Sequence, residues 1–207
     1  MEIELKYFLG DNLAKDRILD DKHLAEMRNP EGDETLQMHA IYFDTAEGDL
    51  RRQQIALRTR FENEHIVVTL KWKGNAIDGL HVRGELNVPA DEAYLAEPTV
   101  EIFRGSEIFE ELETAVAGKP LVQVMEMEFL RQSIHIDTGA SISVVSLDEG
   151  VIRTARGNAE ILEVEVELYS GDQDDMVALG EELAAKYNLI PSDKSKYQRG
   201  LQLLGLE

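Results

Sequence analysis

Four segments of this 207-residue chain carry charged side chains at alternate positions. The charged positions are Glu2, Glu4 and Lys6; Arg58 and Arg60; Lys71 and Lys73; and Glu163, Glu165 and Glu167. Side chains two residues apart on a β-strand point to the same face of the sheet. Each segment therefore predicts a strand with one charged face and one apolar face.

The sign of the charge is sorted by segment. A half-buried antiparallel strand normally has one solvated polar face, but such a face usually mixes acids with bases because like charges repel. Here one segment carries three carboxylates and two others carry paired cations, although the chain holds 41 acidic and 21 basic residues. A solvated face explains any single segment, whereas the set favours charged faces that turn toward a shared ligand.

A closed antiparallel sheet of about eight strands can enclose side chains or one small ligand. Because an uncompensated buried ion costs several kcal/mol, a charged interior needs a ligand that uses both signs. A polyphosphate with divalent metal meets this condition. Guanidinium and ammonium groups bind phosphate oxygens, and carboxylates bind hard cations such as Mg²⁺ or Mn²⁺.

The elements that would position these residues are mostly short strands joined by turns. We expect helices at 11–28, 172–187 and 194–205, a loop at 29–33, and a helix-and-loop excursion at about 90–118. No βαβ alternation and no glycine-rich loop before a helix is present, which argues against a P-loop or a dinucleotide-binding fold. The pattern predicts an antiparallel sandwich or barrel. The expected strands are 2–9, 35–44, 54–62, 65–73, 80–88, 121–130, 132–138, 141–147, 151–155 and 159–169.

Composition limits the function further. The formal net charge of −20 repels nucleic acid and anionic membranes at long range, so basic groups that bind a phosphate must be gathered in one shielded place. There are no cysteines, which excludes disulfides and thiolate chemistry. From the N-terminal residues we expect no signal peptide. No apolar run reaches membrane-spanning length, and we expect a cytoplasmic protein.

Nine short segments, in order along nearly the whole chain, resemble motifs of the CYTH domain, the family also called triphosphate tunnel metalloenzymes. They are Glu2–Lys6 (ExExK), Ile41–Thr45 (YFDT), Ala56–Arg60 (LRxR), Thr69–Lys71 (TxK), Arg83 with Glu85 (RxE), Arg131 after an aromatic, Leu147–Gly150 (LDxG), Glu163–Glu167 (ExExE), and Ser195–Tyr197 with Arg199 and Gly200 (SKYxxG).

The resemblance implies a mainly antiparallel α+β fold, in which an eight-stranded closed β-barrel forms a tunnel and helices pack outside. It implies one CYTH domain over residues 1–207, without an added helical CHAD domain, and two bound Mg²⁺ or Mn²⁺ ions. The catalytic set would be Lys6, Glu4 and Glu165, with Lys6 orienting or deprotonating the attacking water. The implied phosphate ligands are Lys6, Arg58, Arg60, Lys71, Lys73, Arg131 and Lys196. The implied metal ligands are Glu2, Glu4, Glu163, Glu165 and Glu167, with Glu85 and Asp148 as additions.

Two segments resemble the bacterial inorganic triphosphatases of this family: Gly79–His81, and Tyr169–Asp172 after the ExExE strand. The expected reaction is hydrolysis of inorganic triphosphate to diphosphate and phosphate, with a small-molecule partner, no nucleic acid or membrane, and a homodimer left open. A class IV-type adenylate cyclase, a thiamine triphosphatase and a non-enzymatic polyphosphate sensor remain alternatives. The five histidines are interpreted as surface or strand residues, with His81 as the one to watch.

Overall fold

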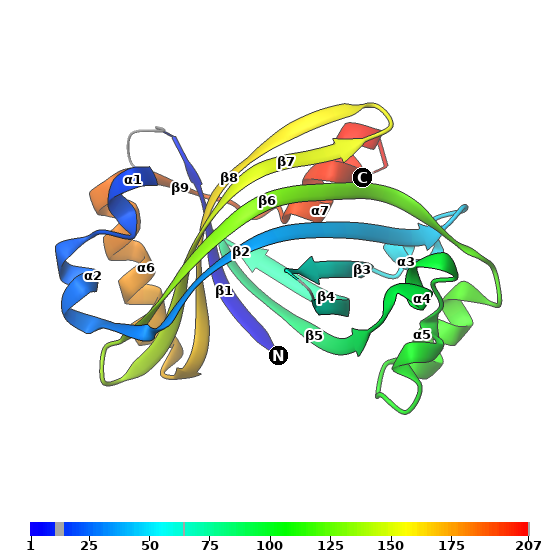
Figure 1. The fold of residues 1–207 in the computed structure, drawn as a ribbon, viewed down its shortest axis with the longest axis horizontal. Coiled ribbons are helices and arrows are strands. Elements are labelled where there is room, and N and C mark those ends of the chain that lie inside the picture. The colour runs from blue at the N-terminus through cyan, green and yellow to red at the C-terminus, as the bar shows by residue number, and fades with distance from the viewer. Residues whose placement is uncertain (11–14, 64, 207) are drawn as a thin grey trace.

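The computed structural model describes residues 1–10, 15–63 and 65–206. Eight strands form a closed antiparallel barrel (Figure 1), in the neighbour order β5-β4-β3-β2-β6-β7-β8-β1, and pairing of β1 with β5 closes the ring. The predicted eight-stranded barrel is therefore confirmed. A ninth strand, β9 (Leu189–Pro191), pairs with the end of β1. The barrel strands are β1 (Glu2–Leu9), β2 (Arg28–Thr45), β3 (Ile55–Glu62), β4 (His65–Ile77), β5 (Leu80–Ala90), β6 (Leu121–Asp137), β7 (Ser141–Thr154) and β8 (Gly157–Gly171).

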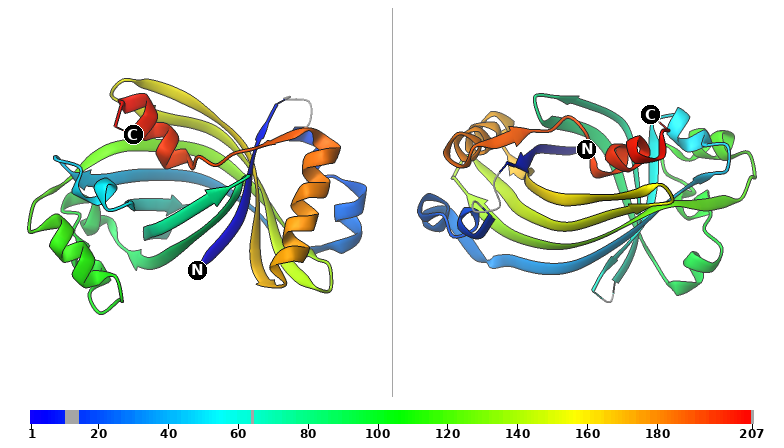
Figure 2. Two further views of the ribbon diagram at one scale, coloured as in Figure 1. Left: turned by 180° about the vertical axis from the view of Figure 1, so that it is seen from behind. Right: turned by 90° about the horizontal axis from the view of Figure 1, so that it is seen from above.

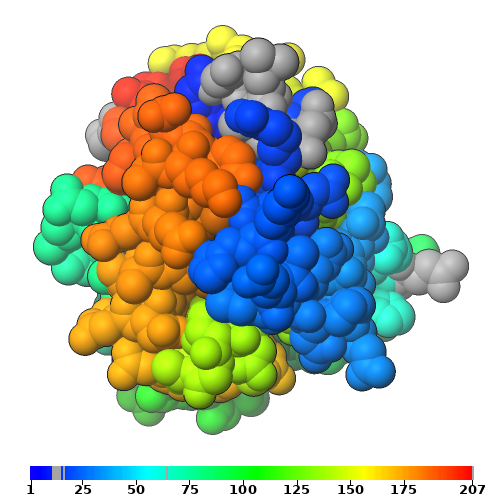
Figure 3. Space-filling view, turned by 90° about the vertical axis from the view of Figure 1, so that its left-hand side faces the viewer, coloured from blue at the N-terminus to red at the C-terminus, as the bar shows by residue number. Residues whose placement is uncertain are grey.

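Helices gather at two ends of the barrel (Figures 1 and 2). One group holds α1 (Lys15–Ile18), α2 (Lys22–Met27) and α6 (Gln173–Tyr187); Figure 3 shows α6 in orange beside the blue 15–27 segment. The other holds α3 (Asp49–Arg52), α4 (Glu92–Ala96), the 3-10 helix η2 (Val100–Phe103) and α5 (Phe109–Val116). The last helix, α7 (Lys196–Leu204), lies against β7 and β8. None of these helices has the length and apolar character that crossing a membrane requires, within the described residues.

The apolar faces of β1, β6, β7 and β8 point outward and pack under α6, because their charged faces point inward. Leu5 and Val166 are buried there with Met176, Leu179 and Leu183 of α6. The predicted helix 172–187 is confirmed, and Asp172 caps it by accepting a hydrogen bond from the backbone N–H of Asp175. α6 lies so close that a Cβ on Gly180 would come within 2.4 Å of Leu5 Cδ1. This packing fixes which face of β1 turns into the barrel.

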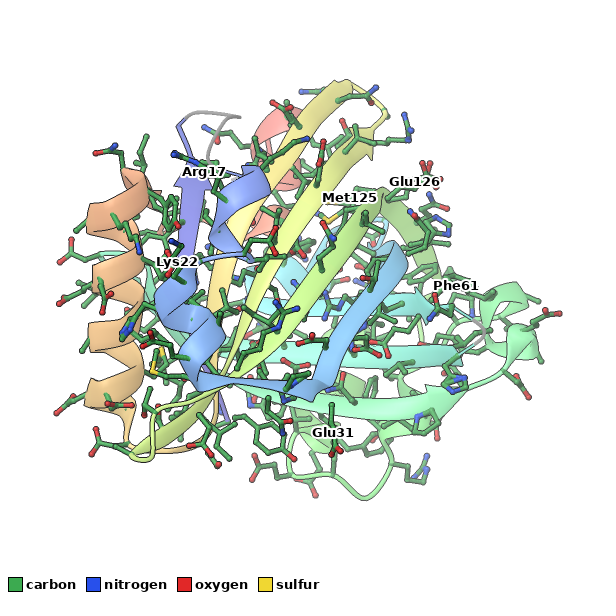
Figure 4. The ribbon with its side chains drawn as sticks, turned by 60° about the vertical axis from the view of Figure 1, so that its left-hand side comes forward. Arg17, Lys22, Glu31, Phe61, Met125 and Glu126 are labelled. Carbon is green, nitrogen blue, oxygen red and sulfur yellow. The ribbon has the colours of Figure 1, made fainter. Side chains whose placement is uncertain are left out.

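Another apolar cluster lies inside the barrel, next to the charged region. Met38 and Tyr42 of β2 meet Met125, Met127 and Phe129 of β6, and Leu201 and Leu204 of α7 pack on them. Figure 4 labels Met125 and Glu126 on β6; Met125 is buried, and Glu126 is only partly covered. α7 thus covers the barrel interior instead of an outer face.

Several element boundaries differ from the predictions. Residues 29–33, predicted as a loop, lie within β2, which continues past a shift in pairing register between Asn29 and Glu34. The segments 121–130 and 132–138 form one strand, as do 141–147 and 151–155. The described part of the predicted helix 11–28 is two short helices, and residues 11–14 lie outside the described residues. α3 and β9 were not predicted, because four- and three-residue elements are too short to show periodicity.

Candidate functional site

The barrel encloses a cavity of about 790 Å³ that is lined by charged groups from seven of its strands, from α3 and from α7. Most of the residues predicted as ligands line it: Glu2, Glu4, Lys6, Arg58, Arg60, Lys71, Glu85, Arg131, Glu165, Glu167 and Lys196. Asp148 and Glu163 are buried behind this lining and bind its cations. The period-two pattern of the strands therefore brings both signs of charge into one space.

One side of the cavity is a dense ionic network between β1, β6, β7, β8 and α7. Arg131 binds Asp148 with two parallel hydrogen bonds of 2.7 and 2.6 Å and also contacts Glu165. Lys196 Nζ lies 2.8 Å from Asp148 Oδ2 and 2.9 Å from Glu165 Oε1. Lys6 lies between Glu165 and Glu4, 2.8 Å from Glu4 Oε2. Each cation is thus shared by two or more carboxylates.

These contacts keep the network charged. Burial alone would raise the pKa of Glu165, but Lys196, then Lys6 and Arg131, hold that pKa well below its ordinary value. Burial would likewise lower the pKa of Lys6, but Glu165 and Glu4 raise it above its ordinary value. Lys6 is therefore a firmly protonated ammonium group in this arrangement.

A second network, on β1, β4 and β5, adjoins the first through Glu4, which binds both Lys6 and Arg83. Lys71 Nζ lies 2.6 Å from Glu2 Oε1 and 2.9 Å from Glu85 Oε2. Arg83 donates to Glu2 and to Glu4, at 2.5 and 2.6 Å. Burial would raise the pKa of Glu2, but Lys71 and Arg83 lower it far below its usual range.

Arg58 and Arg60 of β3 have unmet hydrogen-bonding capacity. Among the described residues, Arg58 has no carboxylate within ion-pair distance; its guanidinium lies 3.5 Å from the hydroxyl of Tyr42. The Nε atoms of both arginines are buried without a hydrogen-bond partner, although Arg60 is paired with Glu62. Burial, followed by repulsion from Arg58, lowers the pKa of Arg60 to about 10. Two adjacent, partly buried guanidinium groups with unmet Nε donors are suited to an anion.

Glu167 of β8 is an acidic residue that lies among other acids. The register of β1 with β8 sets it directly across from Glu4, a like-charge pair that destabilises a sheet. Over residues 1–10, 15–63 and 65–206, no ion pair or hydrogen bond to its side chain is found. Burial, then repulsion from Glu2, Glu4 and Glu165, raises the pKa of Glu167 to about 7. A site that disfavours the carboxylate in this way is suited to a cation.

The carboxylates of Glu2, Glu4, Glu165 and Glu167 have the donor chemistry that a hard divalent ion prefers, since all of them offer oxygen ligands. In the part of the chain that the structure describes, however, no three acidic or histidine side chains converge closely enough to hold a metal. Arg83 stands between Glu2 and Glu4, and Lys6 between Glu4 and Glu165. Cations of the protein take the positions between the acids.

The prediction that Lys73 shares an inward face with Lys71 is wrong. Lys73 has a positive φ of 53°, and the pairing of β4 with β5 shifts register between Trp72 and Asn75. The alternation of β4 is broken at this bulge. Lys73 is therefore exposed, with Nζ 3.5 Å from Glu111 of α5 on the outside.

Four residues near the site were not assigned to it from the sequence: Arg83, Tyr42, His81 and Arg199. The alternation along 80–88 could have indicated Arg83 and His81, which both line the cavity. His81 is buried, and its Nε2 donates to the carbonyl of Ser192 at 2.8 Å. Tyr42 stacks on Tyr197 of α7, with ring centroids 5.0 Å apart.

Comparison with known proteins agrees with this fold. The model of the CYTH domain matches residues 1–201. An inorganic triphosphatase from Haemophilus influenzae is 32% identical over 162 residues, which are 78% of this chain and 44% of that protein. The chain thus spans under half the length of this relative.

Solved structures share the whole fold. A proposed adenylyl cyclase from Hippeastrum, described as having a dominant triphosphatase activity, superposes with a TM-score of 0.70 and 25% identity, over 100% of this chain and 99% of the other. A proposed adenylate cyclase from Bacillus halodurans superposes with a TM-score of 0.61 and 19% identity, over 96% of both chains. With the family model matching nearly every residue of the barrel, the chain belongs to the CYTH domain family.

Proposed function

We propose that this protein hydrolyses inorganic triphosphate to diphosphate and phosphate inside the barrel, with bound Mg²⁺ or Mn²⁺. The observation that carries the proposal is the pair Arg58 and Arg60, which lie partly buried beside further cations of the cavity and whose Nε donors have no hydrogen-bond partner. A chain of phosphates offers acceptors at the spacing of several cations, whereas a single carboxylate or sulfate does not.

In this proposal the residues divide by charge into groups that bind the phosphates and groups that bind the metal. Arg58, Arg60 and Lys71 line the cavity from β3 and β4, and Arg131 and Lys196 approach from β6 and α7. These groups would bind the phosphoryl oxygens and stabilise the charge that builds up on them in the transition state. Arg83 would join them on releasing Glu2 and Glu4.

Glu2, Glu4, Glu165 and Glu167 would hold the divalent metal. The like-charge pair of Glu4 with Glu167 and the raised pKa of Glu167 support a cation at this place. When bound, such an ion screens the phosphate charge and lowers the pKa of a coordinated water. In this proposal Glu85 and Asp148 stay with Lys71 and Arg131, which they hold in place.

Lys6 would orient the attacking water or a phosphate oxygen as a hydrogen-bond donor. Its raised pKa keeps the ammonium protonated, so we assign it no role as a base. Between Glu4 and Glu165, it stands where the proposed metal and phosphate sites meet.

The choice of inorganic triphosphate is supported by the Haemophilus influenzae relative, and triphosphate hydrolysis by the activity described for the Hippeastrum protein. The test is phosphate release from inorganic triphosphate, ATP and thiamine triphosphate at equal concentration with Mg²⁺ or Mn²⁺, with cyclic AMP measured in the ATP sample. We expect the largest kcat/KM for inorganic triphosphate and no turnover after chelation. Cyclic AMP with diphosphate as the main products would replace the proposal with a cyclase, and binding without turnover would replace it with a sensor.

A further inference from the structure

The first glutamate of the acidic strand, Glu163, is bound by two cations of α7. Lys196 Nζ lies 2.7 Å from Glu163 Oε2, and the Arg199 guanidinium donates to Glu163 Oε1. Arg199 also donates to the carbonyl oxygen of Glu160 and lies over the ring of Phe8, 5.0 Å from its centroid. Glu163 is 1% exposed, and each of its oxygens lies within ion-pair distance of a cation of α7, although Oε2 makes no hydrogen bond.

The charge around Glu163 is already balanced. Three carboxylates, those of Asp148, Glu163 and Glu165, form ion pairs with three cations, Lys196, Arg131 and Arg199. Lys6 is a fourth cation, which contacts Glu165. A divalent cation brought to this group would meet no excess of negative charge.

The other end of the same strand is not balanced. Lys71 and Arg83 pair with Glu2, Glu4 and Glu85, and Lys6 is shared with Glu4, whereas Glu167 has no ion pair among the described residues. Glu163 pairs with Phe8 and Asp148, whereas Glu167 pairs with Glu4 and Val144. The two glutamates are four residue steps apart on the strand, about 13 Å along the backbone, so they serve different parts of the interior.

We propose that Glu163 is not a metal ligand but a positioning residue. Together with Arg199 it forms an ion pair that holds the Lys196 ammonium toward the phosphate path, while the metal binds at the Glu4–Glu167 end of the strand. The proposal rests on the proposed function above, because it assigns places within the same site. The proposal gives the glutamates of this strand different roles, although the sequence pattern does not distinguish them.

The first measurement is calorimetric titration of the metal-free protein with Mn²⁺ alone, which does not depend on turnover. Glu167→Gln should weaken Mn²⁺ binding about tenfold or more, as loss of a metal-site group does. Glu163→Gln should leave the Mn²⁺ Kd within about threefold of wild type, because only a distant charge changes. Equal weakening by the two variants would overturn the proposal.

The second measurement is titration with tripolyphosphate in the presence of chelator. In Arg199→Gln, the uncompensated Glu163 carboxylate competes with phosphate for Lys196, and we expect affinity to fall about tenfold. Arg199→Lys should recover part of the loss, because it keeps the charge without the planar fork. Adding Glu163→Gln to Arg199→Gln should restore affinity to within about threefold of wild type, since removal of both partners of a coupled pair is not additive.

A purely structural role for Arg199 predicts the reverse, namely a double variant as weak as Arg199→Gln or weaker, and that result would overturn the proposal. If Glu163→Gln does not fold, judged by circular dichroism, Arg199→Gln decides on its own: unchanged Mn²⁺ binding with weakened tripolyphosphate binding supports the assignment, and wild-type tripolyphosphate affinity contradicts it. Failure of the proposed function has a different signature, a wild-type protein that binds both ligands and releases no phosphate.

Discussion

The Arg58 side chain is partly buried in the barrel, its Nε atom has no hydrogen-bond partner, and no carboxylate of the described residues lies within ion-pair distance of it. A covered charge with an unmet donor is unfavourable for folding, which favours a partner that binds from solution. Its neighbour Tyr42, held by stacking on Tyr197, keeps the group on the cavity side of β3. Charged residues with unmet hydrogen-bonding capacity distinguish a binding site from a charged core in which all groups pair with one another.

Replacing Arg58 by alanine should lower kcat/KM for inorganic triphosphate by about a hundredfold to a thousandfold, the usual cost of losing one preorganised donor to transition-state charge. Arg58→Lys should recover part of this. The matched control is Arg153→Ala, which removes a surface arginine paired with Glu128 on the outer wall. An Arg58→Ala enzyme with wild-type kcat/KM would remove β3 from the phosphate site.

Glu167 makes stability depend on pH. Its pKa is about 7 in the folded protein against an ordinary 4.5, so between these values the folded protein holds a proton that the unfolded chain has released. Its stabilising contribution is therefore present at low pH and is lost as pH rises through about 7.

In chelator, the melting temperature of wild type should fall relative to that of Glu167→Gln between about pH 5 and pH 8, because glutamine stays neutral across this range. Added Mn²⁺ at pH 8 should raise the melting temperature of wild type more than that of the variant. Parallel pH profiles for the two proteins would mean that Glu167 titrates normally.

At the scale of elements, alternation along a strand was enough to find the charged interior. The two faces of β1, β3 and β8 are set by sequence alone, since inward charges alternate with outward apolar residues that pack under helices. Alternation fails where the backbone departs from regular pairing. The bulge after Trp72 turns Lys73 outward, and no local pattern distinguishes Lys73 from Lys71.

Contacts between distant elements were also beyond the sequence. Arg199 reaches Glu163 across 36 positions of the chain, and Arg83 reaches Glu2 across 81. These pairs depend on barrel closure and on the docking of α7, neither of which leaves a periodic signal. The residue types at the site could be predicted, whereas the partner of each could not.

α7 presents Lys196 from its first turn, so its N-terminal cap should matter for binding. The Ser195 side chain accepts from the backbone N–H of Gln198, and the Gln198 side chain accepts from the backbone N–H of Ser195. Ser195→Ala should cost about 0.5–2 kcal/mol of stability and raise the KM for triphosphate roughly threefold to tenfold through misplacement of Lys196.

Asp172→Ala is the matched control, since it removes the cap of α6 on the outer side of the barrel. It should destabilise by a similar amount, about 0.5–2 kcal/mol, with KM unchanged. Thermal unfolding and steady-state kinetics on both variants separate the two effects. Equal KM values would show that the cap of α7 does not influence Lys196.

At the scale of the whole molecule, the net charge of −20 and the inward cations have opposite effects on the binding of polyanions. The acidic exterior weakens long-range attraction of polyanions, and binding therefore depends on the barrel interior. A ligand that fills this interior should also stabilise the closed barrel, because it binds only the folded chain.

In chelator, tripolyphosphate at about a hundred times its Kd should stabilise the protein by about 2.7 kcal/mol, a rise of roughly 5–10 °C in melting temperature for a chain of this size. Sulfate at equal ionic strength controls for screening and should give a much smaller rise. Arg58→Ala should lose most of the difference, and an equal response to sulfate and tripolyphosphate would indicate a non-specific salt effect.

The assignment of separate phosphate-binding and metal-binding groups within the barrel is tested most directly by a crystal structure with Mn²⁺ and a non-hydrolysable triphosphate analogue. Anomalous scattering would locate the metal. We predict manganese beside Glu4 and Glu167, with the phosphates against Arg58 and Arg60. Manganese confined to the outer surface, or a triphosphate bound outside the barrel, would contradict the proposed site.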